Sequence, residues 1–198
     1  MLEAYFQSKK IEAGCDEAGR GCLAGPVYAA AVILPKDYHH PVLTDSKKLS
    51  EKNRNSLRKD IEANAIDFAV TAVDNVKIDE INILQASILA MHLSLDKLKK
   101  KFGFIIIDGN YFKPYRDLPY KTIVKGDSHY FSIAAASILA KTYRDEFITE
   151  AHELYPEYGW IKNKGYATAS HRAAIMKHGF CPLHRRSFQL KEMQLDLF

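Results

Sequence analysis

Short apolar runs alternate along this chain with segments of helical periodicity, and this alternation constrains the fold more than any other feature. The runs are rich in β-branched and aromatic residues and cover residues 10–16, 27–34, 66–74, 104–108 and 121–124. Runs of this length and composition are typical of buried strands. Strands that alternate with helices indicate an α/β fold, in which helices flank one sheet.

Four segments between and after these runs are predicted to be helices. Apolar residues recur at helical spacing over residues 78–101 and 129–152, which predicts two long helices packed against the sheet. Ser50 begins a shorter predicted helix that ends near Asn64, and a last helix covers residues 168–178, before Gly179. We expect one α/β domain over residues 1–155 and a small C-terminal helical cap with a tail over residues 156–198.

The composition argues against several classes of protein. Three cysteines, an odd number with no C-x-x-C spacing, argue against a disulfide framework and a zinc site and favour a cytoplasmic location. Neither a signal peptide nor a membrane-spanning run is expected. A formal net charge of +4 permits binding to nucleic acid without requiring it.

Three acidic residues lie where predicted strands end. Asp16 ends the first predicted strand, Asp108 ends the fourth, and Asp127 follows the fifth and precedes a helix. Strand ends that meet at one edge of an α/β sheet form a rim where ligands bind. Carboxylates that gather there repel one another unless a cation neutralises them, and oxygen ligands without His or Cys favour Mg²⁺ or Mn²⁺. Such ions activate water and stabilise a phosphoryl leaving group.

Each of these acids taken alone is explained more simply as a turn or N-cap residue. Three of them together, beside Gly19-Arg20-Gly21, weaken that explanation. Asp16 and Glu17 are neighbours, and neighbouring strand residues point to opposite faces of a sheet. If both hold one ion, we expect a twist or bulge in the strand, or a contact through the backbone carbonyl of Glu17.

The motifs around these acids together resemble the bacterial ribonuclease HII family, over about residues 11–188 in unbroken order. The resemblance rests on the segments Asp16-Glu17-Ala18-Gly19-Arg20-Gly21, Asp45-Ser46-Lys47-Lys48-Leu49, Ile107-Asp108-Gly109, Lys125-Gly126-Asp127, Asn163-Lys164-Gly165-Tyr166 and His184-Arg185-Arg186-Ser187-Phe188. It implies an α/β, ribonuclease H-like fold, with a mixed five-stranded sheet, flanking helices and a small C-terminal helical cap.

The resemblance also implies an activity. Members of this family cut a strand on the 5′ side of ribonucleotides embedded in duplex DNA, and the RNA strand of RNA–DNA hybrids, and leave a 3′-hydroxyl and a 5′-phosphate. This activity belongs to ribonucleotide excision repair and DNA replication. By resemblance, one or two Mn²⁺ or Mg²⁺ ions are held by four catalytic acids, Asp16, Glu17, Asp108 and Asp127. Asp145 is the alternative fourth acid, although a structural ion pair explains it more simply.

Other matched residues are expected to contact the substrate. Gly19, Arg20 and Gly21 would read the ribose 2′-hydroxyl, because a glycine turn can approach a sugar closely. Tyr166 would contact the deoxyribose beyond the ribonucleotide, although a packed core tyrosine is the alternative. Ser46 and Lys47 would bind phosphates, against the simpler interpretation of a solvated basic surface.

The end of the chain resembles a different motif. Gln194-Leu195-Asp196-Leu197-Phe198 is similar to the pentapeptide with which bacterial replication and repair proteins dock onto the sliding clamp. Gln194 would enter a polar pocket, while Leu197 and Phe198, with Leu195 before them, would bind an apolar groove. A terminal segment that folds back on its own core or frays is the alternative.

Two further functions remain open from the residues. One is a non-catalytic nucleic-acid-binding module, and the other is a metal-dependent phosphatase or nuclease that ignores the 2′-hydroxyl. A monomer is expected by resemblance to the family.

Overall fold

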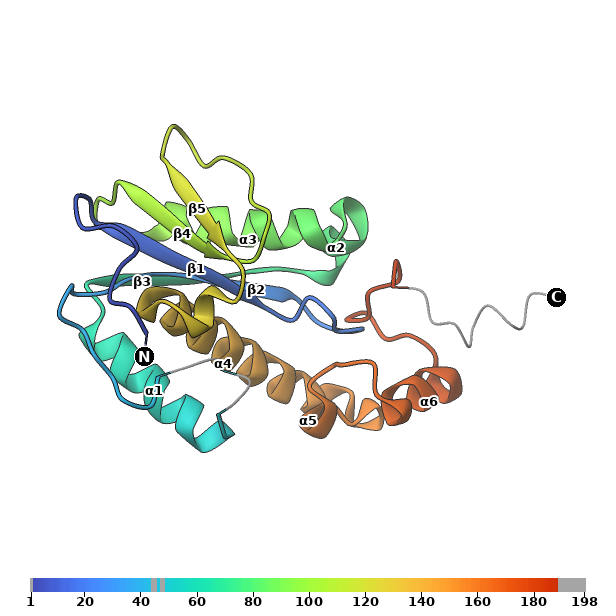
Figure 1. The fold of residues 1–198 in the computed structure, drawn as a ribbon. Coiled ribbons are helices and arrows are strands. Elements are labelled where there is room, and N and C mark those ends of the chain that lie inside the picture. Colours follow the sequence, from blue (N-terminus) through green and yellow to red (C-terminus); the bar gives the residue numbers. More distant parts are fainter. Residues whose placement is uncertain (1, 44–45, 47–48, 189–198) are drawn as a thin grey trace.

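Five strands form one mixed sheet in the computed structural model, which describes residues 2–43, 46 and 49–188 (Figure 1). The strands are β1 Glu12–Ala18, β2 Val27–Ile33, β3 Asp67–Val73, β4 Phe104–Asp108 and β5 Tyr120–Ile123. Their order is β3-β2-β1-β4-β5, with β1, β2 and β3 antiparallel and β4 and β5 parallel to β1. All five predicted strands and the predicted fold class are confirmed.

Helices cover both faces of this sheet (Figure 1). Helix α4, Phe131–Leu154, packs on β1 and β2, and α1, Glu51–Asn64, packs against α4. Helix α3, Ile83–Lys97, covers β2 and β3 on the other face. The approach of α4 is close: a Cβ atom on Gly14 would lie 2.5 Å from the carbonyl carbon of Ser132, so β1 requires glycine there.

The long helix predicted over residues 78–101 is two helices, and that prediction was wrong. Helix α2, Asn75–Ile81, ends before Asn82, which has φ +65°, and α3 begins at Ile83. The Asn82 carboxamide oxygen accepts hydrogen bonds from the N–H groups of Leu84 and Gln85, at 3.0 and 3.2 Å. Asn82 therefore caps α3. The apolar spacing continues across the break, so periodicity alone did not reveal it.

The other predicted helices are confirmed with small shifts at their ends. Ser50 caps α1 by accepting the Asn53 N–H at 3.2 Å. A 3₁₀ turn, η2 Gly126–Ser128, precedes α4. Helix α6, Ala169–His178, begins after its N-cap Thr168 and ends at Gly179.

The C-terminal segment is a cap on one end of α4. It contains the 3₁₀ turn η3 Pro156–Tyr158, helix α5 Trp160–Asn163 and α6. An apolar cluster that includes Leu23, Ile148 and Trp160 joins it to α4 and to the loop after β1. The boundary at residue 155 stays a prediction. In the part of the chain that the structure describes, no helix has the length and apolarity needed to cross a bilayer.

Candidate active site

Asp16 and Asp108 lie on neighbouring parallel strands. Cys15 of β1 is opposite Ile107 of β4. Asp16 and Asp108 are the next residues of the two strands, so they lie at equivalent positions. Cys15 and Ile107 belong to the core on the α3 side, and side chains alternate along a strand. Both carboxylates therefore face the α4 side, where the Ser137 hydroxyl interacts with Asp16. The predicted meeting of distant strand ends is observed for this pair.

Burial and repulsion act together on the Asp16 carboxylate. Burial, followed by the negative charges of Glu17 and Asp108, raises its pKa well above the usual range. The Ser137 hydroxyl and the Glu17 N–H, which donates to Asp16 Oδ1 at 2.7 Å, oppose this shift. A cation beside these carboxylates would remove the repulsion, and oxygen ligands suit a hard divalent ion. The donor set therefore fits Mg²⁺ or Mn²⁺.

Asp127 joins this region through the turn η2. The Gly126 N–H donates to Asp108 Oδ1 at 2.7 Å, which fixes the turn beside the end of β4. Asp127 is buried, and its Oδ1 accepts a hydrogen bond from the Ser128 hydroxyl at 3.4 Å. The structure thus brings the main chain at Asp127 next to Asp108, as the strand-end argument predicts.

Glu17 follows Asp16 at the end of β1, and its negative charge acts on the Asp16 carboxylate. Within these two fully described strands, β1 pairs with β2 residue for residue, from Gly14 opposite Val32 to Ala18 opposite Tyr28. β1 therefore has no bulge at Glu17, and of the predicted alternatives the twist and the contact through the Glu17 backbone carbonyl stay predictions. The Glu17 carboxylate accepts a hydrogen bond from Arg20 at 3.1 Å. Among residues 2–43, 46 and 49–188, no three His, Cys, Asp or Glu side chains already surround a common point.

A cavity of about 210 Å³ is lined by Glu17 and by Ser137, whose hydroxyl interacts with Asp16. Its lining combines an acid, the glycine turn, hydroxyls, a cation and an aromatic ring, contributed by Glu17, Ala18, Gly19, Arg20, Gly21, Ser46, Ser137, Lys141 and Tyr166. An isolated bridge between Cys22 and Tyr166 places the tyrosine alongside the turn. Tyr166 is 40% exposed, so the alternative of a packed core tyrosine was wrong. Lys47 lies outside the described residues.

Two residues of this cavity were missed by the sequence analysis. Ser137 and Lys141 are one helical turn apart on α4, and Ser137 shares a 3.0 Å hydrogen bond with Ser46. Lys141 Nζ lies 5.8 Å from the centre of the Tyr166 ring. The available signal was a pair of polar residues spaced i, i+4 within an otherwise apolar helical run.

Two buried arginines fix the loop between β1 and β2. Arg144 donates to the carbonyl oxygens of Ala24, Pro26 and Lys164 at 2.9–3.3 Å. Arg185 donates to those of Gly25 and Arg20, both at 2.9 Å. Burial, with a contribution from the Arg144 charge, lowers the pKa of Arg185 to about 10. The loop is therefore held through its main chain, which leaves the Arg20 side chain exposed.

Gly19 packs against the side chain of Arg144. It has φ +98°, and a Cβ atom there would lie 2.1 Å from Arg144 Nε. Gly21 differs, because nothing lies within 4 Å of the position that its Cβ would take. The first glycine is thus required by packing, and the second leaves open space beside the cavity.

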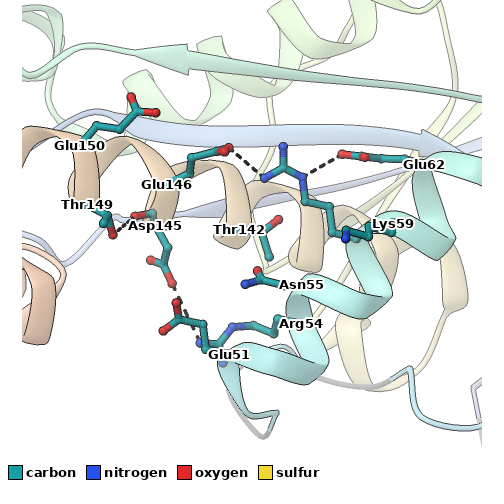
Figure 2. Close-up of a pocket in the computed structure, with 11 residues that line it drawn as sticks. Glu51, Arg54, Asn55, Lys59, Glu62, Thr142, Asp145, Glu146, Thr149 and Glu150 are labelled. Atoms are coloured by element: carbon teal, nitrogen blue, oxygen red, sulfur yellow. Dashed lines mark hydrogen bonds and ion pairs between the residues drawn. The ribbon is translucent and has the colours of Figure 1, made fainter.

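A larger cavity of about 590 Å³ separates α1 from α4 (Figure 2). Within it, Arg58 donates to Glu62 and Glu146 at 2.8 and 2.9 Å. Asp145 accepts from Lys141 at 2.6 Å and lies 4.0 Å from Arg54. Two of these ion pairs, Arg58 with Glu146 and Arg54 with Asp145, link α1 to α4. None of Asp16, Glu17, Asp108 and Asp127 lines this cavity, whereas Glu17 lines the smaller one. The volume of a cavity therefore does not identify the candidate active site. The ion pairs of Asp145 support a structural role for this residue.

Comparison with known proteins identifies the relatives of this chain. Residues 13–191 match the family model described as ribonuclease HII. Ribonuclease HII of Bacteroides thetaiotaomicron is 58% identical over 96% of this chain and 95% of that protein. Ribonuclease H2 from Pyrococcus horikoshii OT3 superposes with a TM-score of 0.75 at 26% identity, over 90% of this chain and 93% of that one. The PCNA:RNase HII complex from Archaeoglobus fulgidus gives a TM-score of 0.73 at 26% identity, over 95% of this chain and 100% of that one.

Proposed function

Because this chain belongs to the ribonuclease HII family, we propose the following account of what it cuts and how. It is a type 2 ribonuclease H, an endoribonuclease that acts on RNA–DNA hybrids. It cuts on the 5′ side of a ribonucleotide embedded in duplex DNA and leaves a 3′-hydroxyl and a 5′-phosphate. One observation carries this proposal: a single cavity joins Glu17 of the acidic pair to the Gly19–Gly21 turn and to Tyr166.

Asp16, Glu17, Asp108 and Asp127 would hold one or two Mg²⁺ or Mn²⁺ ions. A divalent ion bound there activates the attacking water and stabilises the charge that develops on the phosphate. The protein contributes a rim on which two carboxylates already face the same side of the sheet. The Gly126 N–H and the Ser137 hydroxyl orient Asp108 and Asp16. This orientation keeps the carboxylates from turning toward solvent.

The glycine turn would recognise the ribose. Reading one 2′-hydroxyl requires main-chain groups that approach the sugar closely. The open space at Gly21 permits that approach, and the contacts from Arg144 and Arg185 keep the turn in place. The exposed Tyr166 ring, across the cavity, would pack against the following deoxyribose and disfavour a second 2′-hydroxyl there.

Cleavage of defined duplexes tests this function. Three substrates are compared, with one ribonucleotide, with a continuous RNA strand and with DNA alone, each with Mg²⁺, with Mn²⁺ and with EDTA. We expect metal-dependent cleavage of the first two and a cut 5′ of the single ribonucleotide. Equal cleavage of the all-DNA duplex would identify a nuclease that ignores the sugar. Binding without cleavage in every metal would identify a non-catalytic module.

We predict that Lys141→Met weakens substrate binding. Lys141 lines the cavity, and its Nζ donates a hydrogen bond to Asp145, which restrains the side chain. Loss of one phosphate contact raises KM about tenfold at moderate salt, and it lowers the slope of log KM against log salt concentration by about 1. Lys101→Met is the matched control, because Lys101 precedes β4 at the opposite end of the sheet. An unchanged salt slope in Lys141→Met would remove this lysine from the phosphate contacts.

The tail over residues 194–198 lies outside the described residues, and its role remains a proposal. Support comes from the Archaeoglobus relative, whose solved structure is a complex with PCNA. We expect the double variant Leu197→Ala, Phe198→Ala to bind the sliding clamp of its own organism at least about tenfold more weakly. Asp196→Asn is the control and should bind as the natural chain does. Calorimetric titration measures both, and equal affinity of the double variant would exclude docking through this tail.

A further inference from the structure

Two histidines are buried together within the C-terminal cap. His171, in the first turn of α6, and His184, in the turn that follows α6, are almost completely inaccessible. Their Nε2 atoms lie 3.2 Å apart, and the ring centres are 5.4 Å apart. Neither ring lines the cavity described above.

The hydrogen bonds determine where each proton lies. Nδ1 of His184 accepts the Cys181 N–H at 3.0 Å, so a neutral His184 carries its proton on Nε2. That proton is donated to Nε2 of His171, which also accepts the Trp160 Nε1–H at 3.0 Å. Nε2 of His171 therefore carries no proton, and its Nδ1–H donates to the carbonyl oxygen of Tyr166 at 2.9 Å.

These hydrogen bonds run from the Cys181 N–H through His184 and His171 to the carbonyl oxygen of Tyr166, the residue proposed to contact the substrate. The carbonyl of Tyr166 also accepts the Thr168 N–H at 2.8 Å. On its other side the Tyr166 main chain pairs with Cys22, next to the glycine turn. The histidine pair and the turn thus hold the tyrosine backbone from two directions.

Both rings must stay neutral for this arrangement to exist. A proton added to Nε2 of His171 would face the Nε2–H of His184 at 3.2 Å and the Nε1–H of Trp160 at 3.0 Å. A proton added to Nδ1 of His184 would face the Cys181 N–H at 3.0 Å. The titratable groups that face the pair are Tyr158, whose ring centre lies 4.6 Å from that of His184, and His178 behind Tyr158. Burial lowers the pKa of His171, and burial with the neighbouring ring lowers that of His184 to about 4.

We propose that His184 and His171 are positioning residues, which orient Tyr166 in the cavity through the Nδ1–H of His171. The inference rests on the proposed function of Tyr166 in reading the second sugar. The pair does not touch the reacting atoms, so its loss should change sugar discrimination more than the rate of the cut itself.

Two variants of one position separate the hydrogen bond from the bulk of the ring. His171→Asn retains a donor where Nδ1 stands, and His171→Gln extends to the position of Nε2 but has no donor for Tyr166. The measured quantity is the ratio of kcat/KM for a single embedded ribonucleotide to kcat/KM for two consecutive ribonucleotides. We expect His171→Gln to reduce this ratio about tenfold, the effect of one buried hydrogen bond, and His171→Asn to preserve it. Equal ratios in the two variants overturn the proposal, whether both ratios match that of the natural chain or both are lower.

A measurement without substrate keeps this inference separate from the function itself. Long-range ¹⁵N–¹H spectra of the natural chain report the tautomer of each histidine ring. We expect the Nδ1–H form for His171 and the Nε2–H form for His184, both neutral at pH 5.5. Titration of either ring near pH 6.5, or the opposite tautomers, overturns the inference even if the enzyme cuts ribonucleotides as proposed. If the natural chain shows no ribonucleotide cleavage while the tautomers are as expected, the proposed function fails and the hydrogen-bonded chain stands.

Discussion

Asp16→Asn will abolish cleavage and at the same time stabilise the protein. The carboxylate is buried beside Glu17 and Asp108, and these charges raise its pKa. An amide of the same shape removes the repulsion, so we expect a melting temperature about 2–4 °C higher, equivalent to roughly 1 kcal/mol for a chain of this size. It also removes one of the proposed ligands for the ion. Loss of about 4 kcal/mol of transition-state stabilisation corresponds to a fall of about 10³-fold in kcat/KM.

The combined readout distinguishes a functional acid from a structural one. Differential scanning calorimetry and single-ribonucleotide cleavage are measured on the same preparation. Asp117→Asn, at an exposed position in the loop between β4 and β5, is the control and should change neither quantity. A less stable Asp16→Asn variant that still cuts would show that the carboxylate serves the fold and not the reaction.

Gly19→Ala will lose activity because the site no longer folds correctly, whereas Gly21→Ala will remain folded and bind substrate poorly. At Gly19 the new methyl group would meet Arg144 Nε at 2.1 Å, on a backbone with φ +98°. We expect a cost of about 1–2 kcal/mol for the backbone conformation and of about 1–3 kcal/mol for the overlap. Together these costs are about 2–5 kcal/mol, and at about 2–4 °C for each kcal/mol the melting temperature falls by roughly 4–20 °C.

The matched glycine isolates the functional part of the turn. Nothing lies near the Cβ position of Gly21, so Gly21→Ala should melt within about 1–2 °C of the natural chain. Its methyl group would occupy the space through which the ribose approaches, and we expect KM for the single-ribonucleotide duplex to rise about tenfold. A natural KM in Gly21→Ala would place the ribose elsewhere. Equal stability of both variants would show that Gly19 is not held against Arg144.

The strand pattern and the strand-end acids could be predicted from the sequence, and the reason is local. Each strand is a short apolar run, and Asp16 and Asp108 follow from where such runs end. The break at Asn82 was not predicted, because the apolar spacing continues through it and the capping contacts depend on a residue in an uncommon conformation. A twist or bulge at Glu17, or a contact through its backbone carbonyl, was predicted from the requirement that two neighbours share one ion, and the regular pairing with β2 excludes the bulge.

Residues that act across the fold were harder to find. An ion pair was expected at Asp145, and Lys141 and Arg54 supply it. Arg144 donates to three main-chain carbonyls, which no side-chain pattern reveals. His171 and His184 contact each other only after the cap has folded. Such contacts depend on the packing of distant segments, and the sequence offers no spacing rule for them.

The parallel pairing of β1 with β4 has a consequence for synthesis of the protein in the cell. The strand that carries Asp16 is made before α1, β3, α2 and α3, and its partner strand β4 follows these elements, while Tyr166 and the cap follow later still. Long-range pairings of this kind form late because closing a large loop is entropically costly. A nascent or truncated chain that lacks β4 therefore cannot bring the proposed catalytic acids together, so we expect cleavage only from a chain that has completed the sheet.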